Sequence, residues 1–292
     1  MCTSLTMQTK NNEHLLARTM DFAFELDATI SYMPKEYNWA SSLSIAQKFK
    51  TKYAFIGAGR NMGGQYYFVD GVNQHGLAMA ELYFPGEAKY HADTQDQKIN
   101  LAPQELVLWL LGGCRTIDEV TEKLSSVRLV DCPMVIVNIT PPLHYIITDN
   151  TGRVVILESD SGELVLKENP AKVLTNSPEL EWQLKNLNNF LHLSNSEFPT
   201  KNFSDYSAQS FGQGSGSFGL PGGYTPPERF VRAAFLRHTA SAPSTIDEGV
   251  NALLHILHSV DIAKGAVVHQ NGYLDYTQYI SVMSLADKFI FT

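Results

Sequence analysis

The first twenty residues of the chain contain two short stretches in which apolar and polar residues alternate. These stretches are residues 3–9 and 14–20, and the polar segment Lys-Asn-Asn-Glu at 10–13 separates them. Successive side chains of a strand point to opposite faces, so alternation of this kind is typical of half-buried β-strands. The sequence therefore predicts a β-hairpin that starts at the extreme N-terminus.

The same patterns predict the elements that follow. Further strands are expected at residues 53–57, 65–70, 77–82, 134–139, 144–149, 153–158, 163–167, 172–174 and 273–292. Helices are expected at residues 103–111, after the capping box at 116–119, at 177–193, after Thr225 and at 244–260. The glycine-rich segment 199–224 is predicted to form a long ordered loop.

The order of these elements indicates the fold class. Strands and helices fall into blocks and do not alternate one by one, which favours α+β over a doubly wound parallel sheet. No internal repeat or linker divides residues 1–292. A single domain of sheets covered by helices is therefore predicted.

Composition excludes several classes of function. A net charge of −8 without a basic run argues against nucleic acid as a partner. No apolar stretch approaches the roughly 18 residues of a membrane span, and no secretory signal pattern is visible. Cys2, Cys114 and Cys132 have no disulfide or zinc spacing, and the histidines form no ligand-like cluster. We expect no metal, no cofactor and a cytoplasmic location.

Cys2 is the most reactive candidate in the chain. A methionine followed by a small residue is usually removed after translation, so we expect Met1 to be trimmed. Cys2 would then carry a thiol and a free α-amine, whose pKa of about 7.7–8.0 lets it take a proton at neutral pH. An N-terminal amine that activates its own nucleophile is a known form of covalent catalysis. The alternative is an incidental cysteine at a frayed terminus.

Arg18 and Asp21 lie at the end of the second predicted strand. Pairing within the hairpin would return both residues to the side on which Cys2 begins. A fixed guanidinium would stabilise the thiolate, and a carboxylate would orient the amine. The alternative is a structural ion pair at the end of a strand.

The chain resembles the choloylglycine hydrolase family. The resemblance rests on Cys2, Ala-Arg-Thr-Met-Asp at 17–21, Leu-Thr-Asn-Ser-Pro at 174–178 and Arg-Phe-Val-Arg at 229–232, in order across nearly the whole chain. This family contains penicillin V acylases and conjugated bile salt hydrolases, which are N-terminal-nucleophile hydrolases. The resemblance implies a four-layer αββα sandwich, hydrolysis of a non-peptide amide in a small-molecule substrate, and a homotetramer. Relatives continue beyond Thr292, so the chain is expected to be either truncated or a short member.

The resemblance also implies a role for each site residue. Cys2 would be the nucleophile and, through its amine, the general base. Arg18 would support the thiolate and Asp21 would position the amine. Asn176 would contribute to the oxyanion hole and Arg229 would complete the polar cluster. The structural alternatives are a helix cap or turn for Asn176 and a solvated helix residue for Arg229.

Tyr83 bears on the choice of substrate. The corresponding family position is often asparagine in bile salt hydrolases and tyrosine in penicillin V acylases. An aromatic ring there would suit a flat phenoxyacetyl group, which favours a penicillin V acylase releasing 6-aminopenicillanic acid. The alternatives are a conjugated bile salt hydrolase, an N-acyl-homoserine lactone acylase and a catalytically inactive binding relative. Tyr83 could also be a buried tyrosine at a strand end.

Overall fold

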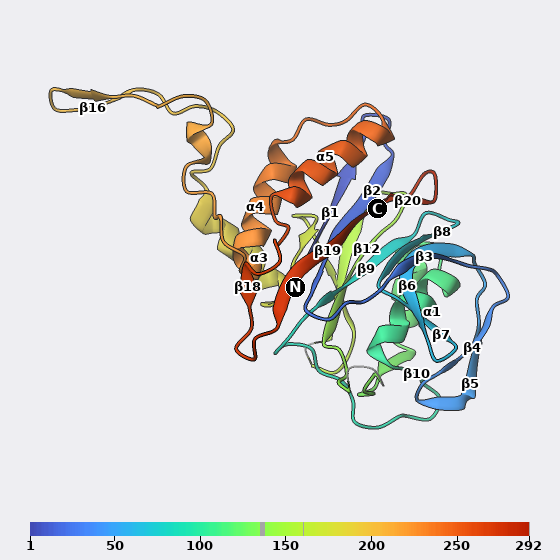
Figure 1. The fold of residues 1–292 in the computed structure, drawn as a ribbon. Coiled ribbons are helices and arrows are strands. Elements are labelled where there is room, and N and C mark those ends of the chain that lie inside the picture. Colours follow the sequence, from blue (N-terminus) through green and yellow to red (C-terminus); the bar gives the residue numbers. More distant parts are fainter. Residues whose placement is uncertain (135–137, 160, 292) are drawn as a thin grey trace.

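Two β-sheets lie face to face between layers of helices in the computed structural model, which describes residues 1–134, 138–159 and 161–291 (Figure 1). The six-stranded sheet consists of β1 (Cys2–Gln8), β2 (His14–Phe22), β15 (Val173–Leu174), β18 (Val267–Val268), β19 (Leu274–Ser284) and β20 (Phe289–Phe291). The eight-stranded sheet consists of β3 (Thr29–Met33), β6 (Phe55–Met62), β7 (Gln65–Phe68), β8 (Asp70–Asn73), β9 (Ala78–Tyr83), β12 (Leu143–Thr148), β13 (Val154–Glu158) and β14 (Val165–Glu168).

Five α-helices and three short strand pairs complete the described part of the chain. The helices are α1 (Leu106–Gly113), α2 (Ile117–Leu124), α3 (Leu180–Asn186), α4 (Pro226–Thr239) and α5 (Ile246–His258), and short 3-10 turns span Pro103–Glu105, Leu187–Phe190 and Ser215–Ser217. The pairs are β4 (Asn38–Ser41) with β5 (Ser44–Lys50), β10 (Ile99–Leu101) with β11 (Val127–Leu129), and β16 (Lys201–Phe203) with β17 (Tyr206–Ala208). No helix among the described residues is long and apolar enough to cross a membrane.

Two apolar cores define the layers. One core joins the inner faces of both sheets and continues to α4 and α5, with Leu16, Ile146 and Phe230 among its members. The other joins the eight-stranded sheet to α1 and α2, with Met79 and Leu111 among its members. The order of layers is helix, sheet, sheet, helix, which confirms the predicted α+β sandwich.

The N-terminal hairpin is confirmed, and its strands are more buried than their alternation predicts. β1 pairs antiparallel with β2, Cys2 opposite Met20 and Ser4 opposite Arg18. Every residue from His14 to Asp21 is buried. The reason is that β2 runs between β1 and β19 in an inner layer, covered by helices on one face and by the second sheet on the other.

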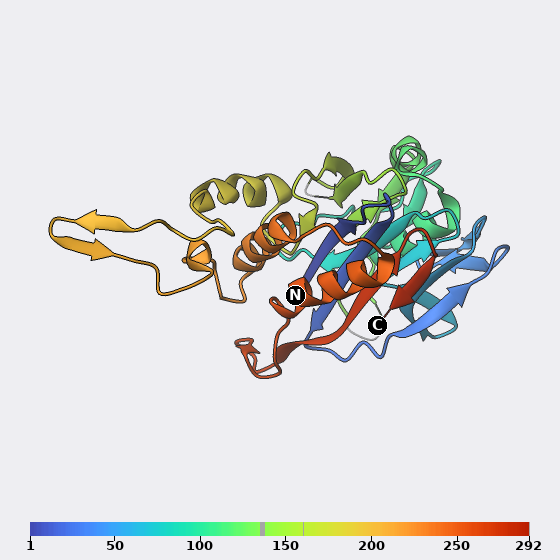
Figure 2. The same cartoon turned by 90° about the horizontal axis from the view of Figure 1, so that it is seen from above.

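The structure corrects several of the predicted elements, among them the strand expected at 65–70, which is divided into β7 and β8. The helix expected at 177–193 is divided into α3 and a short 3-10 turn. The glycine-rich segment is not only loop, since β16 and β17 form a hairpin that projects far from the body (Figures 1 and 2). The last segment folds back on itself, because β20 pairs with β19. The strand expected at 134–139 lies partly outside the described residues.

Candidate active site

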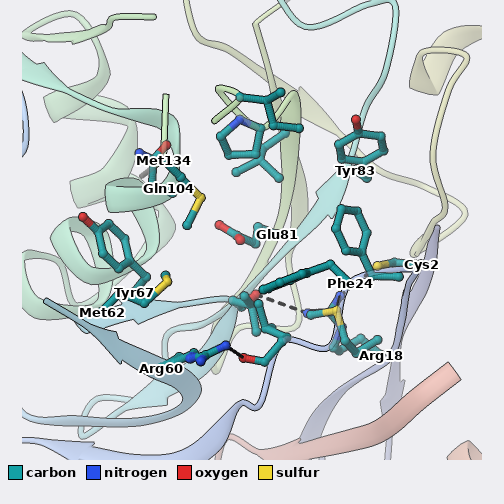
Figure 3. A pocket seen from close by; sticks show the side chains of 17 residues that line it. Cys2, Arg18, Phe24, Arg60, Met62, Tyr67, Glu81, Tyr83, Gln104 and Met134 are labelled. Atoms are coloured by element: carbon teal, nitrogen blue, oxygen red, sulfur yellow. Dashed lines mark hydrogen bonds between the residues drawn. The ribbon is translucent and has the colours of Figure 1, made fainter. Parts of the chain in front are cut away.

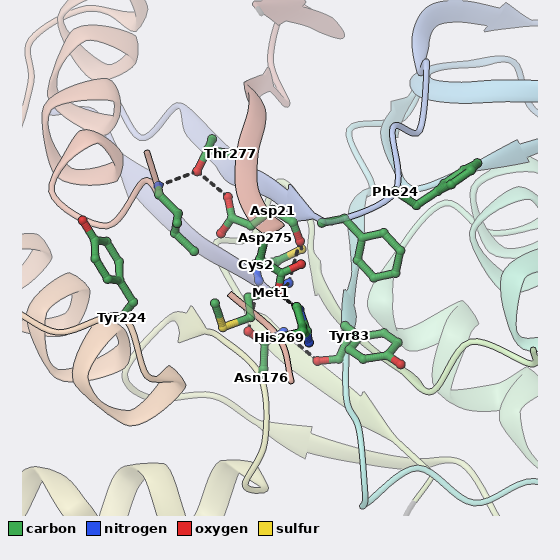
Figure 4. Close-up of polar contacts among 12 residues, drawn as sticks. Met1, Cys2, Asp21, Phe24, Tyr83, Asn176, Tyr224, His269, Asp275 and Thr277 are labelled. Atoms are coloured by element: carbon green, nitrogen blue, oxygen red, sulfur yellow. Dashed lines mark hydrogen bonds and ion pairs between the residues drawn. The ribbon is translucent and has the colours of Figure 1, made fainter. Parts of the chain in front are cut away.

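Cys2 is the first residue of β1 and lies beside the end of β2 (Figure 4). Because its partner in the hairpin is Met20, residues on either side of Met20 flank the thiol. The Cys2 side chain is only 4% exposed and forms part of the wall of a cavity. Cys2 therefore does not lie at a frayed terminus.

Arg18 lies against the Cys2 sulfur and is fully buried. Its Nη2 donates a hydrogen bond to Sγ of Cys2 over 2.9 Å, and its Nε donates to the backbone oxygen of Thr19 over 3.0 Å. Burial acts to lower the pKa of this guanidinium, but the neighbouring Cys2, Tyr279 and Asp70 side chains outweigh burial and raise it. Arg18 is therefore a permanent cation in contact with the Cys2 sulfur.

Asp70, on β8 of the other sheet, holds the far side of Arg18. Its Oδ2 lies 3.5 Å from Nη1 of Arg18 and accepts a hydrogen bond from Oγ of Ser281 over 3.0 Å. Its Oδ1 accepts from the backbone N–H of Ala58 over 3.1 Å. Burial raises the pKa of Asp70, and Arg18 opposes that shift. Donors on three strands thus fix the carboxylate, which in turn fixes the guanidinium.

Asp21 is buried next to the chain start, and its carboxylate is held by two threonines. Thr19 donates to Oδ2 over 2.8 Å. Thr277 donates to Oδ1 over 2.6 Å (Figure 4). Burial raises the pKa of Asp21, while Arg229 and the N-terminal ammonium oppose that shift. The Asp21 carboxylate is therefore held in one position near the N-terminus. This position is the one that the predicted role of orienting the α-amine requires.

Met1 occupies the space directly in front of Cys2. Its ammonium donates to the backbone oxygen of Asp21 over 2.5 Å and lies 3.8 Å from Oδ2 of Asp275. The same Asp275 oxygen lies 2.8 Å from Nε2 of His269 (Figure 4). With Met1 in place the nitrogen of Cys2 is an amide, so it has no basic lone pair and cannot take the proton of the thiol.

Asn176 and Arg229 join the start of β1 to the helical layer. Oδ1 of Asn176 accepts from the Cys2 nitrogen over 3.0 Å and from Nη2 of Arg229 over 2.6 Å. Nη1 of Arg229 donates to the backbone oxygen of Cys2 and to Oγ1 of Thr3, each over 2.6 Å. Burial lowers the pKa of Arg229, and Asp21 acts in the opposite direction.

The structure excludes the solvated-helix alternative for Arg229 and the helix-cap alternative for Asn176, which lies in the bend between β15 and α3. Arg229 is fully buried and is not a solvated helix residue. Asn176 does not cap α3, whose N-cap is Glu179. Nδ2 of Asn176 donates one hydrogen to the backbone oxygen of Tyr83 over 2.6 Å. An amide nitrogen has two hydrogens, so a second remains for the predicted oxyanion.

The cavity beside Cys2 opens to solvent, and its empty space, with that opening included, is about 880 Å³. Figure 3 shows Cys2, Arg18 and Tyr83 at one end, Tyr67, Gln104 and Met134 at the other, and Glu81 between them. The rest of the wall is mainly apolar and is formed by Met20, Phe22, Phe24, Leu26, Arg60, Met62, Val69, Ile139, Pro141 and Leu143. Such a lining, mainly apolar with a few polar groups, is typical of a site for an apolar small molecule.

Tyr83 stands at the end of β9 and lines this cavity. Its ring packs edge-on against Phe22, with ring centres 5.6 Å apart. Burial raises the pKa of the Tyr83 hydroxyl, and Asp275 adds to that shift. Tyr83 is thus a tyrosine at a strand end and also part of the cavity wall. The cavity extends past it.

Sequence reasoning missed several residues that shape the site. Asp70 and Glu81 are acidic residues within apolar strand segments. Carboxylates are rarely buried without a partner, so this position in the sequence could have identified both residues as unusual. Asp275 and Thr277 lie on β19, far from Cys2 in sequence. No local pattern could have placed these two residues beside the hairpin.

Comparisons with known proteins agree with this geometry. A family profile described as linear amide C–N hydrolases, choloylglycine hydrolase family, matches residues 2–292. A bile salt hydrolase/transferase from Clostridium perfringens is 34% identical over 287 residues, 98% of this chain and 86% of the relative. A conjugated bile acid hydrolase from Lactobacillus acidophilus is 31% identical, over 99% of this chain and 90% of the relative.

Solved structures show the same fold. A mutant of the conjugated bile acid hydrolase from Clostridium perfringens superposes with a TM-score of 0.90 at 33% identity, covering 98% of this chain and 86% of the other. A penicillin V acylase from Agrobacterium tumefaciens has a TM-score of 0.78 at 21% identity, covering 99% and 82%. The chain belongs to the choloylglycine hydrolase family of linear amide C–N hydrolases.

Proposed function

We propose that this enzyme hydrolyses conjugated bile salts, releasing the bile acid and glycine or taurine. The observation that carries the proposal is the apolar cavity ending at the Cys2 sulfur. The bile salt hydrolases among the relatives are 30–34% identical over nearly the whole chain, whereas the penicillin V acylase is a distant structural neighbour. These findings favour the bile salt alternative over the acylase that Tyr83 led us to expect.

The cavity shape supports a bulky acyl group. Tyr83 lines the wall near Cys2, and the cavity continues to Tyr67 and Gln104 (Figure 3). A steroid bound by its ring system would extend past the tyrosine and bury its apolar surface against the methionine and phenylalanine side chains. Burial of apolar area contributes roughly 25 cal/mol per Å², so a larger acyl group gains more from this cavity than a phenoxyacetyl group does.

The chemistry we propose uses Cys2 after removal of Met1. The freed α-amine takes the thiol proton, and the sulfur forms a bond to the amide carbonyl carbon while Arg18 stabilises the thiolate. The second N–H of Asn176 stabilises the negative oxygen of the tetrahedral intermediate. The C–N bond breaks as the Cys2 ammonium gives its proton to the departing amine. Water then gives a proton to the α-amine and its oxygen to the thioester carbon, and the C–S bond breaks.

Parallel turnover of glycocholate, taurocholate, penicillin V and an N-acyl-homoserine lactone tests this assignment. We expect kcat/KM to be highest for a bile salt conjugate. A preference for penicillin V would contradict the proposal and restore the acylase, and turnover of only the lactone would identify the third activity. Mass spectrometry of the N-terminus is the control, because a protein that retains Met1 lacks the catalytic amine. Fully trimmed protein that cleaves none of the four would be a binding relative.

We further propose that the enzyme is a homo-oligomer, the family resemblance implying a tetramer. The projecting hairpin supports this, since Phe203 and Tyr206 are 58% and 69% exposed. Exposed aromatic side chains on an extended arm are typical of an interaction site. Light scattering of the wild type and of a Phe203→Ser, Tyr206→Ser double variant tests the proposal. Monomeric wild type would contradict it.

We also propose a cytoplasmic location. Cys2, Cys114 and Cys132 are all free cysteines. Unpaired thiols are typical of proteins in reducing compartments. Fractionation of the source cells followed by immunodetection tests the proposal, and recovery of the protein outside the cytoplasm would contradict it.

A further inference from the structure

Glu81 places a carboxyl group in the middle of the apolar cavity. It lies on β9 two residues before Tyr83, so both side chains face the same side of the sheet and both line the cavity. Its neighbours Ala80 and Leu82 point the other way into the core between the sheets. Oε2 of Glu81 is buried and has no hydrogen-bond partner among the described residues. A buried polar atom without a partner is costly, by about 1–3 kcal/mol.

Gln104 contributes a second unpartnered acceptor to the same cavity. Its Nε2 donates to the backbone oxygen of Cys132 over 3.4 Å. Its Oε1 is buried and has no partner within the described part of the chain. Two buried acceptors from different elements thus border a cavity whose wall is otherwise mainly apolar.

The charge state of Glu81 limits which chemical groups of a ligand could form a hydrogen bond with its carboxyl. Burial raises its pKa to about 8, with Arg18 lowering and Asp70 raising it. Glu81 also interacts electrostatically with the phenols of Tyr90, Tyr145 and Tyr279. At neutral pH the carboxyl is therefore mostly uncharged, and it both donates and accepts a hydrogen bond. A neutral carboxyl has no charge with which to attract an ammonium group, whereas a hydroxyl matches both of its functions.

We propose that Glu81, assisted by Gln104, binds a hydroxyl group carried on the acyl part of the substrate. Figure 3 places Glu81 between the Cys2 end of the cavity and the end at Gln104, so the hydroxyl lies on the body of the acyl group, away from the scissile amide. The choice of a hydroxylated steroid as the acyl group rests on the proposed function. It assigns Glu81 as a residue that sets substrate preference and takes no part in bond cleavage.

The test compares kcat/KM for two glycine conjugates, of cholic acid, which carries ring hydroxyls, and of cholanic acid, the same ring system without them. We expect the wild type to prefer the hydroxylated conjugate by at least about ten-fold, and Glu81→Met to reduce the preference to within about two-fold. Glu81→Gln keeps a donor and an acceptor and should retain most of it. Met62→Leu, a change in the apolar wall of the same cavity, should leave the ratio between the two substrates unchanged.

The outcomes separate the subsite from the proposed function. A wild type without preference, or a Glu81→Met variant that keeps it, overturns the subsite. If neither conjugate is cleaved, the proposed function fails, and the same variants are compared on penicillin V and its para-hydroxyphenoxy analogue. If nothing is cleaved, calorimetric binding of cholate and cholanate gives the same comparison. In each case the subsite is supported if the wild type prefers the hydroxylated compound and Glu81→Met removes that preference. The subsite is overturned if the wild type shows no such preference or if Glu81→Met keeps it.

Discussion

The Arg18 guanidinium lies 2.9 Å from the Cys2 sulfur, and the two side chains come from paired strands of one hairpin. On its other side the same guanidinium lies 3.5 Å from the Asp70 carboxylate, which belongs to the second sheet. A buried cation therefore joins the Cys2 thiol to the second sheet. We expect changes on its two sides to affect different properties, thiol reactivity on one side and folding stability on the other.

Replacing Arg18 with Met should make Cys2 less reactive. The variant loses a charge-assisted hydrogen bond to the sulfur, which is worth about 10–150-fold in rate. Both kcat/KM and the rate of alkylation by iodoacetamide should fall by factors in this range. Arg18→Lys is the control, because it keeps the charge without the planar group and should lose less. Unchanged alkylation in Arg18→Met would mean that the contact does not activate the thiol.

Replacing Asp70 with Asn should mainly lower the free energy of unfolding. Loss of the carboxylate leaves the Arg18 charge buried without its carboxylate partner, and breaking such a pair costs about 3–5 kcal/mol. Ser281→Ala removes only one hydrogen bond to Asp70 and should cost about 1 kcal/mol. Urea unfolding of the three proteins measures the difference. Equal stability of Asp70→Asn and wild type would contradict this account of the pair.

Replacing Cys2 with Ser should nearly abolish hydrolysis while leaving the fold intact. A hydroxyl is a far weaker nucleophile than a thiol at neutral pH. Serine is also small, so Met1 should still be removed, and mass spectrometry checks this before the rates are compared. Wild-type turnover by trimmed Cys2→Ser protein would exclude Cys2 as the nucleophile.

Asn176→Ala should lower kcat by about 10²–10³, because the oxyanion contact forms only in the transition state. Asn176 also accepts hydrogen bonds from the Cys2 nitrogen and from Arg229, so the alanine variant changes more than one contact. Asn176→Asp keeps an oxygen acceptor there and removes the N–H donor. It should lose a similar factor in kcat. A change confined to KM in both variants would show that Asn176 binds substrate only.

The parts of this site that the sequence predicted are those with a local signal. The hairpin follows from alternation and a polar turn, and it alone brings Arg18 and Asp21 to Cys2. The helix caps at Thr116 and Thr225 follow from local capping residues, and both are observed. These features depend on contacts between residues that are at most about twenty positions apart in the sequence, and a single sequence can reveal such contacts.

The remaining site contacts have no local signal. The Cys2 nitrogen meets Asn176 across 174 positions, and the Cys2 oxygen meets Arg229 across 227. Only the family resemblance placed Asn176 and Arg229 at the site. The position of Glu81 in the cavity could not be predicted from the sequence. The cavity wall around Glu81 is formed by strands and loops that are distant from one another in sequence.

Glu81 should make the stability of the enzyme depend on pH in a way that Glu81→Gln removes. Its pKa is raised from 4.5 to about 8 in the folded protein. Below the lower value both states are protonated and the carboxyl has no effect. Between the two values the unfolded chain releases the proton while the folded protein keeps it, so stability falls as pH rises.

Relative to Glu81→Gln, the wild type should lose about 3–5 kcal/mol across this window and no more above it. Urea unfolding of both proteins from about pH 5 to about pH 9 measures the difference. Parallel curves would mean that Glu81 ionises in the folded protein as it does in water, and that the carboxyl facing the substrate is charged at neutral pH.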